Sequence, residues 1–144
     1  MTSLTVANSA FTMDVDSPAL PTTLIMQGYT ADDAFDVENI APNEVMTGVD
    51  GRLSGGYVYV PVKLKFTLQA DSPSIFSMDT WWQSMGANKD SFTANATIVA
   101  PSLGKVWTFT KGFLTGYKPI PSGKKLFQGQ AYEITFERMI AAAA

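Results

Sequence analysis

Histidine and cysteine are both absent from the 144 residues of this chain. Without them the chain cannot build Ser-His-Asp or Cys-His nucleophile systems, thiolate zinc sites or imidazole metal ligands. Disulfides are excluded as well, so nothing favours an oxidising compartment. Carboxylates, serine, lysine and tyrosine could still act, which keeps catalysis as a third-ranked alternative. We therefore expect a protein that is not an enzyme and that has no cofactor and no metal site.

Basic residues are missing from the first fifty positions, and the first base is Arg52. The formal charge is −8 before Arg52 and +5 from Arg52 onward, which gives the net −3. One interpretation is that the folded surface has opposed acidic and basic regions through which copies meet head to tail. The other is that folding mixes the two signs again. The acidic residues at 32–38 do not match the spacing of a calcium loop and are expected to form a solvated surface.

Long apolar runs are missing too. No stretch approaches the ~20 apolar residues of a membrane span, and residues 1–9 lack the basic start and apolar block of a signal peptide. We expect synthesis in a cytoplasm and no membrane anchor.

Most of the chain has the period-2 alternation of half-buried strands. Residues 57–70 are the clearest case, with apolar side chains at 62, 64, 66, 68 and 70 and polar ones between them. Residues 92–98 and 132–137 repeat the pattern, and residues 4–15 and 22–30 are also expected to be strands. Residues 105–117 have a strand composition rich in threonine and aromatics, with a bulge or bend predicted at Gly112. A hairpin loop is predicted at 101–104, and fraying at the terminal alanines 141–144.

One segment has helical spacing instead. A single stripe of apolar residues is expected to face the core: Ile75, Met78, Trp82 and Met85. Ser72 is the predicted N-cap before Pro73, and Gly86 the predicted stop. Trp81 lies off the stripe and is the candidate for contact with another molecule.

The stretch at 31–56 is long and loosely patterned, and Asp50-Gly51 within it is a two-residue hairpin signal. We expect an extended arm at about 40–56 that orders on a neighbouring subunit; an ordinary surface hairpin is the alternative. The predicted fold is mainly β, an antiparallel barrel or sandwich with one flanking helix at about 73–86 and an extended hairpin arm. Residues 1–144 are expected to form one domain.

This order of elements resembles the tail tube proteins of long-tailed bacteriophages. Four short sequence segments are similar to segments of the tube proteins of contractile-tailed phages: residues 28–35, 48–51, 69–74 and 112–119. The resemblance covers roughly residues 4–137 and extends to the needle component of type VI secretion.

The resemblance implies a structural subunit of the virion tail, made in the host bacterial cytoplasm. Six copies would close into rings, and the rings would stack into a tube that conducts the genome without binding DNA specifically. The implied partners are further copies of the chain and the tail sheath, baseplate and tail terminator proteins. Candidate residues for contact between rings are Glu44, Asp50, Gly51 and Arg52. Candidate lumen-facing residues are Lys63, Lys65, Thr67, Gln69, Glu133, Thr135 and Glu137.

The alternative function is a monomeric β-sandwich module that binds a ligand such as carbohydrate. It would use Trp81, Trp107 and exposed tyrosines as stacking platforms.

Overall fold

Strands dominate the computed structural model, which describes residues 9–17, 20, 24–26 and 35–143. In chain order the elements are β1 (Ala10–Val15), β2 (Leu24–Ile25), β3 (Phe35–Val37), β4 (Asn43–Thr47), β5 (Leu53–Tyr57), β6 (Val62–Leu68), α1 (Ser74–Asn88), β7 (Ala94–Ala100), the 3-10 turn η2 (Pro101–Leu103), β8 (Lys105–Gly116) and β9 (Gln130–Ala143). The expected class is confirmed: the described residues form an antiparallel β-sandwich with one α-helix.

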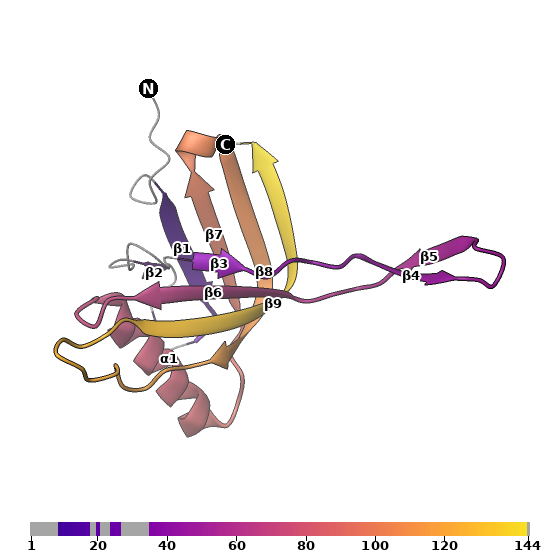
Figure 1. Ribbon diagram of the computed structural model, residues 1–144. Coiled ribbons are helices and arrows are strands. Elements are labelled where there is room, and N and C mark those ends of the chain that lie inside the picture. The colour runs from indigo at the N-terminus through magenta and orange to yellow at the C-terminus, as the bar shows by residue number, and fades with distance from the viewer. Residues whose placement is uncertain (1–8, 18–19, 21–23, 27–34, 144) are drawn as a thin grey trace.

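Seven strands form one antiparallel sheet in the order β2-β1-β7-β8-β9-β6-β3. The long strands β8 and β9 belong to both layers of the sandwich. The first half of β8 lies between β7 and the end of β9, whereas the first half of β9 lies between β6 and the end of β8. Figure 1 shows β6 and β3 crossing the direction of β1, β7 and β8 steeply. The sheet folds over without closing into a barrel.

A bulge occurs where β8 passes between the layers. The register between β7 and β8 shifts between Ala94 and Ala96, and Lys111 has a positive φ of 51°. The bulge predicted at Gly112 is therefore present, and its distorted backbone is at the preceding residue, Lys111. The loop predicted at 101–104 is also confirmed, since η2 is followed by Gly104 with a φ of 65°.

The core lies between the two layers. The alternation in β6 and β9 is confirmed, because these strands turn one face fully inward. The largest buried side chains are Trp81, Tyr132, Phe11, Phe66, Phe109 and Phe136. Edge-to-face and stacked ring pairs join Phe66 to Phe11 (5.3 Å) and to Tyr132 (5.6 Å), so the layers interlock through aromatic side chains.

The helix α1 closes one end of the sandwich, and its predicted inward stripe is confirmed for the fully buried Met78 and for Ile75 and Met85, which are partly buried against the core. The helix is nevertheless rotated from the predicted orientation. Trp81 is fully buried and Trp82 is half exposed, which reverses the expectation for both. The Trp81 indole donates a hydrogen bond to the Phe92 carbonyl at 3.0 Å, and this bond fixes the rotation of the helix. The buried hydroxyl of Ser84 contacts that of Ser17 at 3.0 Å.

The ends of α1 differ slightly from the prediction. The helix begins at Ser74, whose amide donates to the Ser72 hydroxyl at 3.3 Å, so Ser72 does satisfy a free donor, although Pro73 occupies the N-cap position. The helix does not stop at Gly86. It continues to Asn88 and ends where Lys89 adopts the left-handed conformation.

The remaining predictions on strands are mixed. The strands predicted at 4–15 and 22–30 are confirmed where the chain is described, as β1 and β2. Residues 4–8 and most of 22–30 lie outside the described residues, and so do residues 28–34 of the segment 28–35 that resembles tail tube proteins. Fraying of the terminal alanines is wrong for 141–143, which pair with Trp107, Val106 and Lys105 of β8. Ala144 lies outside the described residues.

Candidate assembly surfaces

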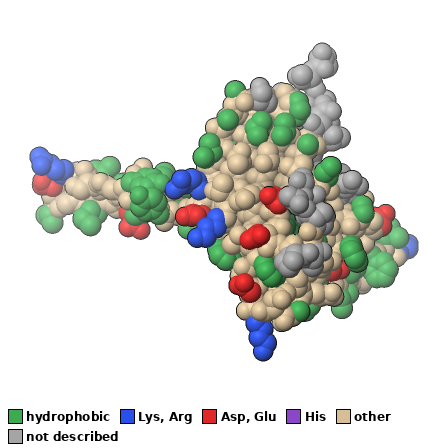
Figure 2. Space-filling view, turned by 180° about the vertical axis from the view of Figure 1, so that it is seen from behind, with side chains coloured by type: hydrophobic (Ala, Val, Ile, Leu, Met, Phe, Trp, Pro, Cys, Tyr) green, Lys and Arg blue, Asp and Glu red, His purple; other side chains and the backbone are tan. Residues whose placement is uncertain are grey.

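The hairpin of β4 and β5 forms an arm that projects from the sandwich (Figure 1). All ten residues of the two strands are exposed. Four apolar side chains on it are open to solvent: Val45, Met46, Val49 and Leu53, with Val49 fully so. Figure 2 shows apolar side chains along the arm and charged ones at its tip. An isolated two-stranded hairpin is marginally stable, and such apolar exposure indicates an interaction surface.

The tip of the arm is a five-residue connection rather than the predicted two-residue turn. Gly48 and Arg52 close it through a backbone hydrogen bond of 2.9 Å, and the Gly51 amide donates to the Gly48 carbonyl at 3.0 Å. Gly51 has a φ of 83°, which favours glycine. The Asp50 carboxylate accepts from the Arg52 amide at 3.1 Å. Three of the candidate residues for contact between rings thus meet at the tip, while Glu44 lies on β4 opposite Gly56.

The lumen candidates share the outer face of the layer formed by β3, β6, the first half of β9 and the second half of β8. Register places Lys63 opposite Thr135 and Lys65 opposite Glu133. Thr67 is on the same face, and Gln69 and Glu137 lie just beyond the paired ends of β6 and β9. The structure therefore brings the predicted residues onto one surface, which we call the outer face.

Sequence reasoning missed the contribution of β3 and β8 to this outer face. Asp36 is the register partner of Lys65, and the Lys65 ammonium lies 3.0 Å from the Glu38 carboxylate and 4.0 Å from that of Glu133. The hydrogen bond and charge of Lys65 lower the pKa of Glu38, and Glu38 raises the pKa of Lys65 in return. On β8, the Thr115 hydroxyl lies 3.2 Å from Glu133 Oε1.

The outer face is thus acidic in balance. The side chains of β3, β6 and β9 that alternate onto this face include two lysines, Lys63 and Lys65, and three acids, Asp36, Glu133 and Glu137. Glu38, just after β3, adds a fourth acid through its contact with Lys65, whereas Arg138 of β9 is out of step with this alternation. The lysines expected to oppose an acidic lumen are therefore outnumbered on their own surface.

Two strand edges of the outer-face layer lack a neighbour within the described residues. β3 is the last strand of the sheet, and β8 from Phe113 to Gly116 pairs with β9 only. Unpaired edges of this kind are sites where another strand can add.

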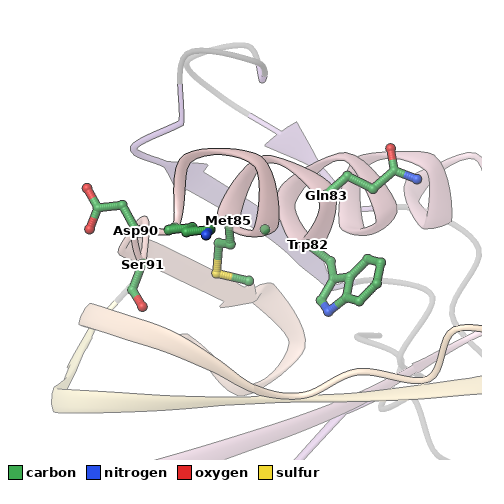
Figure 3. A pocket seen from close by; sticks show the side chains of 7 residues that line it. Trp82, Gln83, Met85, Asp90 and Ser91 are labelled. Atoms are coloured by element: carbon green, nitrogen blue, oxygen red, sulfur yellow. The ribbon is translucent and has the colours of Figure 1, made fainter.

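The aromatic residues expected to serve as a platform for a sugar ligand do not lie together: Trp107 on β8 is partly buried, whereas Tyr57 and Tyr59 at the base of the arm are exposed. Trp81 is buried in the core, so its expected external contact is wrong. Trp82 stacks on Tyr117 at 5.1 Å with ring planes 3° apart, which covers one of its faces. A hollow of about 490 Å³ lies beside Trp82 at the end of α1, and Figure 3 shows Trp82 and Met85 on the strand side of the helix.

Beneath this stack the Tyr117 hydroxyl donates to the Asp79 carboxylate. Burial, with the Asp79 charge nearby, raises the pKa of Tyr132 to about 12 and raises that of Tyr117 further. The Tyr132 hydroxyl is buried and has no hydrogen-bond partner among the described residues.

The described part of the chain contains neither a metal-ligand cluster nor a membrane-spanning helix. Residues 9–17, 20, 24–26 and 35–143 hold no group of three acidic ligands placed to bind an ion. Within the same ranges, α1 is too short and too polar to span a bilayer.

Solved structures with this architecture come from contractile injection systems. A chain of the PVC sheath-tube complex of an extracellular contractile injection system, in its extended state, matches with a TM-score of 0.57 and 12% identity; the match covers 93% of this chain and 88% of that one. A chain of the 6-fold symmetrised anti-feeding prophage baseplate matches at 0.52 with 14% identity, covering 99% and 98%. A chain of the anti-feeding prophage tube terminating cap matches at 0.57 with 7% identity, covering 100% and 93%.

At these identities the likeness concerns the fold alone, and at that level the resemblance to tail tube proteins is confirmed. The chain belongs to the family described as tail fiber protein gp32, whose model matches residues 3–140. No curated protein matches the sequence.

Proposed function

We propose that this protein is the structural subunit of a phage tail tube, in which rings of six copies stack around a lumen that conducts the genome during infection. The observation that carries the proposal is the exposed apolar arm on a sandwich with open strand edges. A monomer gains nothing from keeping such surfaces in water, whereas an assembly buries them. The fold likeness to chains of sheath-tube, baseplate and cap structures supports the same role.

The order of strands in the outer-face layer supports ring closure. Its four strands, β3-β6-β9-β8, alternate in direction. Because the number is even, the β8 edge of one copy can pair with the β3 edge of the next and continue the antiparallel order. Such a head-to-tail contact closes into a ring when the rotation between copies divides a full turn. The 6-fold symmetry of the baseplate structure that contains a similar chain supports six copies in each ring.

In this arrangement the outer face lines the lumen. Lys63, Lys65, Thr67, Gln69, Glu133, Thr135 and Glu137 would then face the DNA. Lys65 forms ion pairs with Glu38 and Glu133, and these pairs compete with binding of a DNA phosphate. An acidic wall repels phosphates and lets DNA slide, in contrast to the basic surface of a DNA-binding protein.

The remaining parts of the proposal concern organisation and partners. Residues 1–144 would form one tail-tube-like domain, with the arm at about 40–56 and its Glu44, Asp50, Gly51 and Arg52 meeting the adjacent ring. Sheath, baseplate and terminator proteins would be the partners in the virion tail, after synthesis in the host bacterial cytoplasm. The role is structural rather than enzymatic.

Electron microscopy of negatively stained protein across a concentration series tests the proposal. Rings or hollow tubes of uniform width are expected for the wild type, with or without added tail initiator components. The variant Asp50→Ala/Gly51→Ala should lose tube growth while its circular dichroism spectrum stays unchanged, because the tip is fully outside the sandwich. Monomers alone at high concentration, with initiator present, would refute the tube; normal tubes from the variant would refute the role of the tip.

A further inference from the structure

A groove of about 650 Å³ lies where the arm leaves the sandwich. Ile40, Tyr57, Tyr59 and Val60 supply its apolar wall, and Glu137 and Arg138 of β9 supply an adjacent acid and base. Tyr57 and Tyr59 contact each other edge to face at 5.1 Å, and both are largely exposed. Tyrosine and arginine are both enriched in protein interfaces relative to the rest of the surface.

The groove adjoins unsatisfied backbone. β6 pairs with β9 only as far as Phe136, so from Glu137 onward β9 pairs with β8 alone among the described strands. A chain segment that entered the groove would meet both an apolar wall and open backbone donors and acceptors.

The tip of the arm has the complementary chemistry. Val49 is fully exposed and Leu53 is 65% exposed, so the tip presents apolar side chains without any neighbour to cover them. Asp50 and Arg52 lie between Val49 and Leu53 in the sequence and form an acid and a base two residues apart. The tip could place its base against Glu137 and its acid against Arg138.

We propose that the arm tip of one copy occupies the groove at the arm base of a second copy. This inference rests on the proposed function and names the surface that receives the arm. Val49 and Leu53 cover the Tyr57–Tyr59 wall, Arg52 pairs with Glu137, and Asp50 pairs with Arg138.

The tip of the same copy cannot fill the groove. Along the chain, Leu53 lies four residues from Tyr57 and Val49 lies nine residues from Ile40, which at about 3.3 Å per residue is roughly 13 to 30 Å. Each copy therefore offers one tip and one groove at a distance, and the contact is head to tail. Contacts of this type propagate from copy to copy. The distance between a groove and the groove of the copy that fills it is then limited by the reach of the arm, at most about 30 Å for the nine residues from Ile40 to Val49.

Disulfide trapping tests the contact directly, because the chain contains no cysteine of its own. Two single variants, Val49→Cys at the tip and Val60→Cys in the groove, are prepared separately and exposed to a mild oxidant, alone and mixed. We expect a covalent dimer in the mixture at a yield at least several times that of either variant alone, because a disulfide requires Cα atoms within about 7 Å. Leu103→Cys, exposed on η2 outside the groove, is the matched control and should give no such product with Val49→Cys.

A charge exchange gives a second readout. Arg52→Glu and Glu137→Arg should each raise the protein concentration needed for assembly by about tenfold, and the double variant should restore it. Neither side chain has a hydrogen bond or ion pair within the described part of one copy that an exchange would break.

The outcomes separate this inference from the tube itself. Tubes without the mixed dimer, or with the dimer equally formed by Leu103→Cys, overturn the tip-in-groove contact and leave the tube standing. The mixed dimer without tubes supports the contact and overturns the tube. Failure of both overturns both proposals.

Discussion

Gly112 allows β8 to cross the core where it passes between the two layers, and its replacement by alanine is the sharpest test of the packing. A Cβ atom at this position would lie 2.5 Å from two ring atoms of Phe136 and 2.7 Å from the Cγ2 atom of Ile134. Contacts this short do not occur in real structures, so at least one of these side chains must move. Both are fully buried.

The magnitude follows from what blocks that movement. Phe136 packs against Phe109 with ring centroids 5.0 Å apart, and Phe109 is itself 1% exposed. Inserting a methyl group into a filled core of this kind costs about 1–3 kcal/mol. Because two buried side chains are crowded at once, we expect Gly112→Ala to lose about 3 kcal/mol of unfolding free energy.

Urea denaturation of the unassembled protein measures this loss. With a slope of about 2 kcal/mol per molar urea, the midpoint should fall by about 1.5 M. Gly86→Ala is the matched control, since a Cβ there meets nothing within 4 Å and alanine favours the helix by up to about 1 kcal/mol. If Gly112→Ala unfolds within about 0.5 kcal/mol of the wild type, a range typical of surface changes, the tight contact between β8 and β9 is not as described.

Three further predictions concern the helix, the buried tyrosine and the outer face. Trp81→Ala should cost about 3–5 kcal/mol in urea denaturation, but Trp82→Ala only about 1 kcal/mol; equal losses would contradict the observed rotation of α1. Tyr132→Phe should raise the free energy of unfolding at neutral pH by about 1 kcal/mol, because it removes a buried hydroxyl without a described partner. Tyr132→Phe should also reduce the loss of stability at alkaline pH. Burial raises the folded pKa of Tyr132 from 10.0 to about 12, so the stabilisation that comes from keeping this hydroxyl protonated is complete below pH 10.0 and is lost as the pH rises to about 12. A pH series of melting temperatures would contradict this if wild type and variant declined in parallel. At pH values above 4.5, Glu38→Gln should cause a small decrease in the melting temperature. Because Lys65 lowers the folded pKa of Glu38, the stabilisation by Glu38 is lost as pH falls through that folded pKa, and wild type and variant should then melt together. High salt should also reduce the difference in melting temperature.

The strands of the core could be predicted because one face of each is buried. In β6 and β9 every second side chain is apolar, and a shift by one residue would expose all of them. The arm was predictable for the opposite reason, since a hairpin signal lay in a segment without a consistent buried face. Its turn type was not, because the choice depended on the Gly48–Arg52 hydrogen bond and on Asp50 binding the Arg52 amide.

The rotation of α1 could not be predicted from periodicity. Apolar residues occur on two overlapping stripes, and the prediction took the one that contains Trp82. Ser74 and Ser84 are small and polar, yet both are buried beside Trp81, so the true buried face looks polar in the sequence. The hydrogen bond between Trp81 and the Phe92 carbonyl comes from a residue outside the helix, which no helical pattern contains.

The candidate surfaces were predictable in part. That Lys63 and Lys65 share a face with Thr67 follows from strand period alone, but their partners depend on register and on which strands lie side by side. Glu133 is 68 positions from Lys65, and Glu38 is 27 positions away on the other side of the chain. The groove at the arm base was not foreseen, because its two walls come from segments near 57 and near 137 that only the fold joins.

The segregation of charge along the chain acquires a physical meaning at Lys65. An acid from the strongly acidic first part of the chain, Glu38, meets a base from the second part within one copy, so folding does mix the two signs. The ammonium of Lys65 is paired with Glu38, while Asp36 and Glu133 lie beside Lys65 as additional acids. Negative charge therefore predominates on the outer face. At the arm tip, in contrast, Asp50 and Arg52 lie close together and are both exposed. The Lys65 charge on the outer face is therefore paired within one copy, whereas the charges of Asp50 and Arg52 at the tip are available to pair with another copy in the proposed contact. A surface of the first kind suits a wall past which a polyanion slides, and a surface of the second kind suits a joint between subunits.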